Sequence, residues 1–180
     1  MRYFEDDIET DYTTLSTEEL YSHLANICLE EIMYSSDAYI CMINLNLHGY
    51  KRLHRMQSKK FYNLYLELQN DIVEMYHKIL PVEQEFERYK VDNLKNHLYH
   101  WNKRNQINLK SIGEIIKNIF EKDGYIPCVA QKMQKIIYRN LIKNERAIQK
   151  FEDCDWSNEV IYIHDKYIHD KVKNDEHHEG

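Results

Sequence analysis

Residues 46–54 read NLHGYKRLH, and this stretch separates two long amphipathic patterns. On either side of it, apolar residues recur at intervals of three and four, which is typical of one face of a bundle helix. The first pattern comprises Leu20, Leu24, Ile27, Tyr34, Ala38, Cys41 and Leu45. The second comprises Leu53, Phe61, Leu64, Leu68, Ile72, Met75 and Ile79. We therefore predict two helices of about 28 residues each, antiparallel because their connection is short.

Cap and turn residues mark the expected ends of these two helices. Ser16-Thr17-Glu18-Glu19 has the S-x-x-E pattern of a capping box, so the first helix is expected to begin there. Gly49 is expected to end it, since glycine is favoured just beyond a helix C-terminus. Pro81 is expected to end the second helix, because the residue before a proline is disfavoured in the helical conformation.

The remaining sequence predicts two further helices and an all-α fold. Periodic, isoleucine-rich patterns predict helices at about 107–121 and about 128–151, whereas the polar and aromatic residues 82–103 indicate a connecting segment with a short helix. The chain contains only 4 Gly and 2 Pro, which disfavours a turn-rich fold. Two helices, a long crossing segment and two more helices give an antiparallel four-helix bundle of the ferritin-like layout.

The bundle is expected to occupy residues 16–151, between an acidic N-terminal arm at 1–15 and an acidic C-terminal extension at 152–180. The extension contains a tandem duplication, YIHDK at 162–166 and again at 167–171. Its period of five matches neither a helix nor a strand, so a short fifth helix and an extended segment are both compatible with it. The terminal NDEHHEG is expected to be disordered because it is polar and charged.

Residues 20–80 resemble the mini-ferritins of the Dps family, in which one helix ends in H-W-N-x-x-G and a further histidine lies at the start of the next. Asn46 and Gly49 match the N-x-x-G, and His54 resembles the following histidine. The resemblance implies a ferritin-like bundle that oxidises or stores iron in an oligomeric cage. Judged from the residues alone, His48 and His54 are interpreted as turn and surface residues.

The iron ligands that the resemblance implies are replaced in this chain. Asn44 stands where the motif's first histidine would lie, and an amide is a poor substitute for an imidazole at iron. Counted from the later histidine, the family's aspartate and glutamate positions fall on Gln69 and Val73. We therefore treat iron binding as the alternative interpretation.

Glu31 is an acidic residue on the apolar face of the first predicted helix. If the turn is centred on the glycine, Glu67 lies level with Glu31 and Asp71 lies one turn further, so a metal-binding acid cluster is geometrically allowed. The other interpretation is that Glu31 pairs with a lysine or an arginine, since buried charges are usually paired.

Charge is unevenly distributed along the chain, whose net charge is −6. Residues 1–19 carry seven acids and one base, residues 151–180 carry nine acids and three bases, and the middle carries 14 acids and 20 bases. The acidic residues predicted to contact a partner are Glu5, Asp6, Asp7, Glu9, Asp11, Glu152, Asp153 and Asp155. The predicted basic patch, at the start of the second helix, comprises Lys51, Arg52, Arg55, Lys59 and Lys60. This asymmetry favours charged partners.

The sequence contains no G-x-S-x-G, P-loop or H-E-x-x-H motif. We therefore predict a non-catalytic helical interaction protein that needs no cofactor; the alternative is a divergent iron-binding or ferroxidase protein. The expected partner is a protein with a basic surface, such as a DNA-replication or transcription factor or a sliding clamp, which the acidic ends would bind and inhibit. Direct nucleic-acid binding is less favoured because acidic arms repel phosphate, and a homodimer is allowed.

Composition also indicates a cellular setting. The 15 tyrosines are typical of an AT-rich genome, such as that of a low-GC bacterium or its phage, and a small phage protein of this kind suits host takeover. We expect a cytoplasmic protein, in the host cytoplasm if it is phage-encoded. This expectation rests on the absence of a signal-like segment, of a long apolar run and of a C-x-x-C pair.

Overall fold

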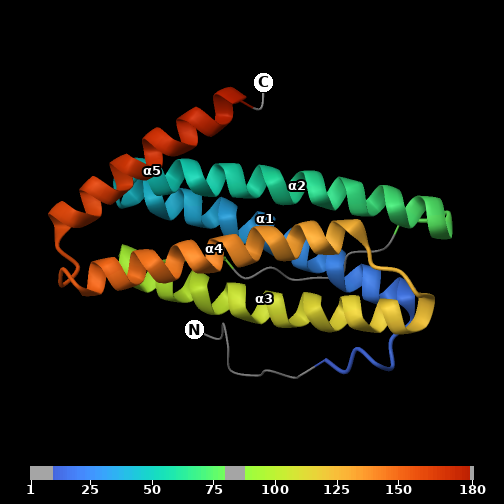
Figure 1. The fold of residues 1–180 in the computed structure, drawn as a ribbon. Helices are drawn as coiled ribbons and strands as arrows, with labels where there is room; N and C mark the ends of the chain where they lie inside the picture. Colours follow the sequence, from blue (N-terminus) through green and yellow to red (C-terminus); the bar gives the residue numbers. More distant parts are fainter. Residues whose placement is uncertain (1–9, 80–87, 179–180) are drawn as a thin grey trace.

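The computed structural model describes residues 10–79 and 88–178, and this part of the chain contains five α-helices (Figure 1). They are α1 (Thr17–Asn44), α2 (His48–Tyr76), α3 (Leu94–Asp123), α4 (Cys128–Glu152) and α5 (Asn158–His178). The predicted all-α, ferritin-like bundle is confirmed, and α5 is a fifth helix added to it. Within the described ranges, no helix is both long and apolar enough to cross a membrane.

The four long helices form two antiparallel pairs, α1 with α2 and α3 with α4 (Figure 1). At one end of the bundle, the start of α1 packs with the end of α2, the end of α3 and the start of α4. The opposite end brings together the end of α1, the starts of α2 and α3, and the end of α4. Helices α2 and α3 therefore run in the same direction, and the end of α2 and the start of α3 lie at opposite ends of the bundle.

The start of α1 and both ends of α4 follow the predictions. The capping box is present, since the Ser16 amide donates to Glu19 Oε2 at 2.7 Å and the Glu19 amide donates to Ser16 Oγ at 3.2 Å. Helix α4 matches its prediction to within a residue. Helix α2 ends at Tyr76, where His77 adopts the left-handed conformation with φ of 54°, so the prediction that Pro81 ends this helix is wrong.

Helix α3 begins well before its predicted start near residue 107. Asn93 caps it, because its side-chain oxygen accepts the amide of Asn96 at 2.8 Å. The first turns bury Leu94, His97, Leu98 and Trp101, so their inward face mixes aliphatic, aromatic and imidazole side chains. The segment 82–103 was therefore wrongly assigned over its last ten residues, because this mixed face does not give a long aliphatic stripe.

The corner between α1 and α2 differs from the prediction. Asn46, with φ of 57°, adopts the left-handed conformation and ends α1, whereas Gly49 lies within the first turn of α2. A Cβ atom on Gly49 would lie 2.0 Å from the carbonyl oxygen of Asp165 in α5. The glycine is therefore required by the close approach of another helix, and the prediction that it ends α1 is wrong.

Helix α5 leaves the end of α4 and crosses beside the start of α2 (Figure 1). It contains both copies of YIHDK in one helix, which decides between the two open interpretations. Asp165 and His164 of the first copy contact α2: Asp165 Oδ1 accepts the amide of Tyr50 at 2.9 Å, and His164 Nδ1 lies 3.2 Å from the Tyr50 hydroxyl. The expected disorder of the terminal NDEHHEG is wrong for residues 174–178, which are helical, while residues 179–180 lie outside the described residues.

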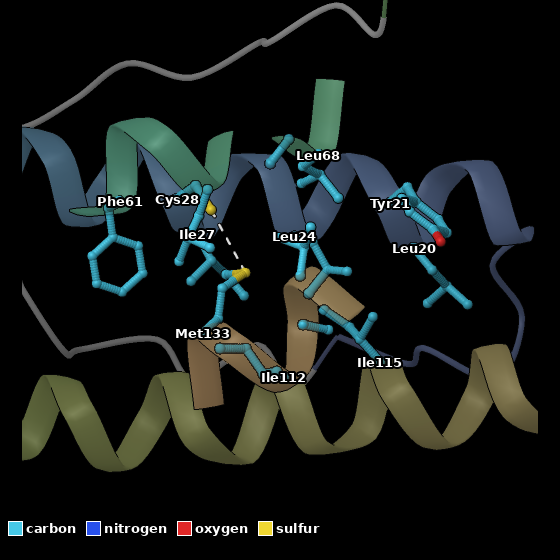
Figure 2. Packing of buried hydrophobic residues seen from close by; sticks show 14 of the residues in the cluster. Leu20, Tyr21, Leu24, Ile27, Cys28, Phe61, Leu68, Ile112, Ile115 and Met133 are labelled. Carbon is cyan, nitrogen blue, oxygen red and sulfur yellow. Dashed lines mark hydrogen bonds between the residues drawn. The ribbon is translucent and has the colours of Figure 1, made fainter. Parts of the chain in front are cut away.

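Two apolar clusters form the core of the bundle. The first lies at the end where α1 begins, and Figure 2 shows its aliphatic side chains meeting between the helices, with Cys28 Sγ 3.6 Å from Met133 Sδ. The second is more aromatic; its bulkiest members are Tyr34, Tyr50, Tyr89, Trp101 and Phe151. On each long helix, polar side chains separate the residues of one cluster from those of the other.

Candidate functional site

A layer of polar side chains lies between the two apolar clusters and draws residues from all four long helices. We define this polar layer by Glu31, His54, Gln57, Arg104, Asn105, Asn108, Asn140 and Asn144. All are buried except Arg104, whose side chain is 18% exposed. Buried polar groups cost free energy unless they are paired, so a complete layer of them needs a structural or functional reason.

Glu31 is the charged centre of the polar layer. Its Oε1 accepts one hydrogen bond from Nε of Arg104 and another from Nδ2 of Asn108, both at 2.7 Å. The same guanidinium lies 3.4 Å from the Glu30 carboxylate and 5.1 Å from the centre of the Tyr34 ring. Burial raises the pKa of Glu31, while the charge and hydrogen bond of Arg104 oppose that rise. The arrangement is a buried ion pair in which the carboxylate already has its cation.

Several other atoms of the polar layer have no hydrogen-bond partner among the described residues. They are Glu31 Oε2, His54 Nδ1, Gln57 Nε2, both amide atoms of Asn105, and Nδ2 of Asn140 and of Asn144. Each such buried atom costs about 1–3 kcal/mol if it stays unpaired. The donors are mostly neutral amides, which suit water or a neutral polar ligand better than a highly charged ion.

His54 of the polar layer pairs with a second buried histidine, His97, on the side of the aromatic cluster. His54 Nε2 lies 2.8 Å from His97 Nε2, and the Tyr89 hydroxyl lies 2.9 Å from His97 Nδ1. The ring of Trp101 lies 4.5 Å from that of His54. Burial lowers the pKa of His54 to about 3 and the pKa of His97 well below its ordinary value, so both imidazoles are neutral. The prediction that His54 is a surface residue is wrong.

The carboxylates proposed as an alternative metal site have different partners. Glu67 pairs with Lys132 of α4, whereas Glu31 pairs with Arg104 of α3. Burial raises the pKa of Asp71, as do the nearby charges of Glu67 and Glu74. The turn is centred on residue 46 rather than 49, so the residue of α2 level with Glu31 is the buried Phe61, and Glu67 lies nearly two turns further along.

The predicted basic patch is divided between two neighbouring hollows. The first, which we call the basic pocket, has a volume of about 250 Å³ and is lined by Tyr39, His48, Lys51, Arg52, Arg55 and His169. The second is a shallow groove along α1 and α2, of about 770 Å³, lined by Ile32, Ser35, Ser36, Tyr39, Ile40, Arg55, Ser58, Lys59 and Tyr62. Lys60 lines neither hollow.

The predicted acidic contact residues are only partly described. Glu5, Asp6, Asp7 and Glu9 lie outside the described residues. Asp11 is described, and its side chain accepts the Thr13 amide at 3.0 Å, which fixes a local turn. Glu152, Asp153 and Asp155 are exposed between α4 and α5, where the Tyr99 hydroxyl donates to Glu152 and the Gln149 amide donates to Asp153.

Sequence reasoning missed most of the polar layer: it singled out Glu31 and His54, and it interpreted His54 as a surface residue. A usable signal was present: Asn105 and Asn108 are three apart, Asn140 and Asn144 are four apart, and each pair interrupts an isoleucine pattern. Such spacing places polar residues on the inward face of a helix.

No protein-family model and no curated protein sequence matches the chain. Its fold is similar to those of solved archaeal ferritins. The open-pore ferritin of Archaeoglobus fulgidus superposes with a TM-score of 0.73 at 15% identity, over 85% of this chain and 95% of the ferritin. A humanized archaeal ferritin superposes with a TM-score of 0.75 at 13% identity, over 87% of this chain and 98% of the ferritin. An engineered closed form of the Archaeoglobus fulgidus ferritin superposes with a TM-score of 0.72 at 15% identity, over 87% of this chain and 97% of the ferritin. The chain therefore has a ferritin-like fold.

The residues of the polar layer fit iron poorly. Across residues 10–79 and 88–173, no three His, Cys, Asp or Glu side chains come together as a metal-binding group. The one carboxylate in the layer is held by an arginine, and its other neighbours are amides, which are weak ligands for iron. A second cation beside Arg104 would also meet like-charge repulsion.

Proposed function

We propose that the chain is a non-catalytic ferritin-like bundle that binds a macromolecular partner through the outer face of α1 and α2. The observation that carries the proposal is the Glu31–Arg104 ion pair, with its 2.7 Å hydrogen bond, at the middle of the bundle. The pair supplies within the protein the positive charge that a metal would otherwise provide. The bundle then serves as a rigid scaffold, and its activity lies on its surface.

The groove along α1 and α2 supports this assignment. Ile40 and Tyr62 line it and are 48% and 52% exposed, so apolar surface faces solvent there. Exposed apolar hollows of this size are typical of protein–protein contact sites. Arg55 and Lys59 form a basic rim, which favours a partner segment with apolar residues and carboxylates.

The class of partner follows from the charges at the same end of the bundle. Glu152, Asp153 and Asp155 are exposed where α4 meets α5, beside the aromatic cluster. Carboxylates presented on a rigid body suit a protein with a basic surface, and a DNA-replication or transcription factor is our proposed example. Inhibition of that factor is part of the proposal, because a bound acidic surface competes with DNA.

A capture experiment tests the proposed function. The immobilised protein is exposed to a low-GC bacterial lysate at moderate salt, beside an Ile40→Asp/Tyr62→Asp variant and a Tyr138→Asp variant. Tyr138 is an equally exposed tyrosine on α4 and serves as the matched control. We expect one protein to be retained by the native chain and by the control and to be lost with the groove variant. Equal retention by all three, or none by the native chain, contradicts the proposal.

A second candidate function, iron binding or oxidation by a divergent mini-ferritin, is favoured by the likeness to archaeal ferritins. That likeness covers 95% of the open-pore ferritin chain. Anaerobic addition of Fe(II) followed by air distinguishes the two candidates. For the interaction protein we expect no stoichiometric ferric-oxo absorbance and no cage-sized particle by light scattering. Rapid oxidation together with a cage-sized particle would instead establish the second candidate.

A further inference from the structure

The basic pocket lies where three helices meet, apart from the polar layer. Tyr39 comes from α1, the four residues from His48 to Arg55 come from α2, and His169 comes from α5. His48, Arg52 and Arg55 are spaced by four and three residues, so they share one face of α2. The pocket is thus a hollow walled on one side by α5.

Positive charge dominates the lining of the basic pocket. Lys51, Arg52 and Arg55 bring three formal positive charges, and no acidic residue of the described chain lines it. Two carboxylates of α5 lie nearby: Asp165 accepts the Tyr50 amide at 2.9 Å, and Asp170 lies 3.4 Å from Nδ1 of the pocket residue His169. Lys51 and Arg55 lie one turn apart on α2 and bring two positive charges to the same hollow, which attracts an anion.

The wall of the pocket is held in place by the docking of α5. The missing side chain of Gly49 lets the backbone of Asp165 approach α2, and the Asp165 carboxylate fixes that approach through the Tyr50 amide. Nε2 of His169 then lies 3.5 Å from the Arg52 guanidinium. A site whose walls are fixed before binding loses less entropy when a ligand enters.

The side-chain chemistry selects the ligand. Arginine presents a planar fork of N–H donors that matches phosphate oxygens, and lysine adds a compact charge. Three cations around about 250 Å³ suit several phosphate groups in a short chain better than a single carboxylate. We propose that the basic pocket binds a small molecule through a di- or triphosphate group. The pocket adjoins the α1–α2 groove of the proposed function and shares Tyr39 and Arg55 with it, whereas Lys51 lines the pocket and not the groove.

Calorimetric titration of the full chain with inorganic tripolyphosphate tests the proposal. We expect one binding site per chain, with an affinity that falls as salt is raised. Sodium sulfate at the same ionic strength is the reference, and it should bind at least tenfold more weakly, because a single tetrahedral anion meets fewer of the donors.

Two variants and a matched control locate the site. Lys51→Gln and Arg55→Gln should each weaken tripolyphosphate binding at least tenfold. Lys59→Gln removes the same charge one turn further along α2, outside the pocket, and should change the affinity less than twofold. Circular dichroism and thermal denaturation without ligand establish that each variant is folded. If Arg55→Gln is unfolded, Lys51→Gln decides alone.

Three outcomes would overturn the proposal. The first is no binding of tripolyphosphate at millimolar concentration. The second is equal weakening by Lys51→Gln and Lys59→Gln, which indicates general attraction to α2 rather than a pocket. The third is tighter binding of a short DNA duplex that depends on both lysines, which assigns the patch to nucleic acid. None of these results bears on partner capture, which depends on Ile40 and Tyr62.

Discussion

Glu31 has almost no exposed surface, and its charge is tolerated because Arg104 and Asn108 both donate to it. Arg104→Ala should destabilise the protein by about 3 kcal/mol, since it leaves a buried carboxylate without its cation. The double variant Glu31→Leu/Arg104→Leu should recover most of that loss, because neither charge then needs solvation. Urea denaturation of the native, single and double variants measures both effects. A loss below about 1 kcal/mol for Arg104→Ala would mean that the pair is not buried in solution.

The buried histidines make stability depend on pH. Burial lowers the pKa of His54 to about 3, while an unfolded histidine titrates near its ordinary value of 6.5. Above pH 6.5 neither the folded nor the unfolded state protonates the imidazole, so this contribution to the free energy of unfolding is fully present. Below pH 6.5 the unfolded state binds a proton, whereas the folded state stays neutral until the pH approaches 3. The free energy of unfolding should therefore fall by up to about 1.4 kcal/mol per pH unit for each buried histidine.

The control for this pH dependence is an exposed histidine. We expect His54→Gln to reduce the slope of unfolding free energy between pH 6.5 and pH 4.5, relative to the native chain, while His48→Gln leaves that slope unchanged. Urea denaturation at several pH values gives the slope. An identical slope in all three proteins would show that His54 is solvated rather than buried.

Among the helices, Gly49 and Gly113 offer a matched pair of substitutions. A Cβ on Gly49 would lie 2.0 Å from the Asp165 carbonyl oxygen, whereas a Cβ on Gly113 would lie 3.7 Å from the Gln134 side chain. Gly49→Ala should therefore displace α5 and cost roughly 2 kcal/mol or more, by overpacking against a backbone. Gly113→Ala should stabilise the protein by about 0.5–1 kcal/mol, because glycine is unfavourable inside a helix.

Hydrogen exchange distinguishes a local effect at Gly49 from a general one. In Gly49→Ala, amides of α5 and of the first turn of α2 should lose protection, while those of α3 and α4 keep it. Equal protection of α5 in the native chain and in Gly49→Ala would mean that α5 does not dock on α2 in solution.

How well an element was predicted depended on what its inward face contains. Helices α1, α2 and α4 present long aliphatic stripes, and their periodicity alone located them. At the start of α3, the buried Leu94 and Leu98 alternate with the buried His97 and Trp101, so the aliphatic pattern there is short and interrupted. The role of Gly49 depends on Asp165, which lies more than a hundred positions away, and no local pattern contains that information.

For the whole molecule, the fold was predictable whereas the polar layer was not. Four amphipathic helices and one long connection define a ferritin-like bundle. The apolar pattern of each helix predicts that helix but not its register against the other three. The pairing of Glu31 with Arg104 depends on the register between α1 and α3, and the turn at residue 46 shifts the register of α2 against α1 by about six residues. The predicted metal cluster of Glu31, Glu67 and Asp71 assumed a turn centred on Gly49, and it therefore combined side chains that lie at different levels of the bundle.

The place of α5 in the whole molecule is the last prediction. Val160, Ile161 and Ile168 pack against the aromatic cluster, and Asp165 caps the start of α2, but the four-helix body has its own core without them. A chain that ends at Ser157 should therefore fold cooperatively. It should lose about 3–5 kcal/mol, because several aliphatic side chains are no longer buried. That loss corresponds to a melting temperature roughly 10 °C lower for a chain of this size.

A chain that ends at Lys173 is the control, since it keeps Asp165 and the buried Val172, and its melting temperature should stay close to that of the full chain. Thermal denaturation followed by circular dichroism compares the three proteins. If the chain that ends at Ser157 shows no cooperative transition, α5 belongs to the folding unit itself, and the four-helix body is not an independent scaffold.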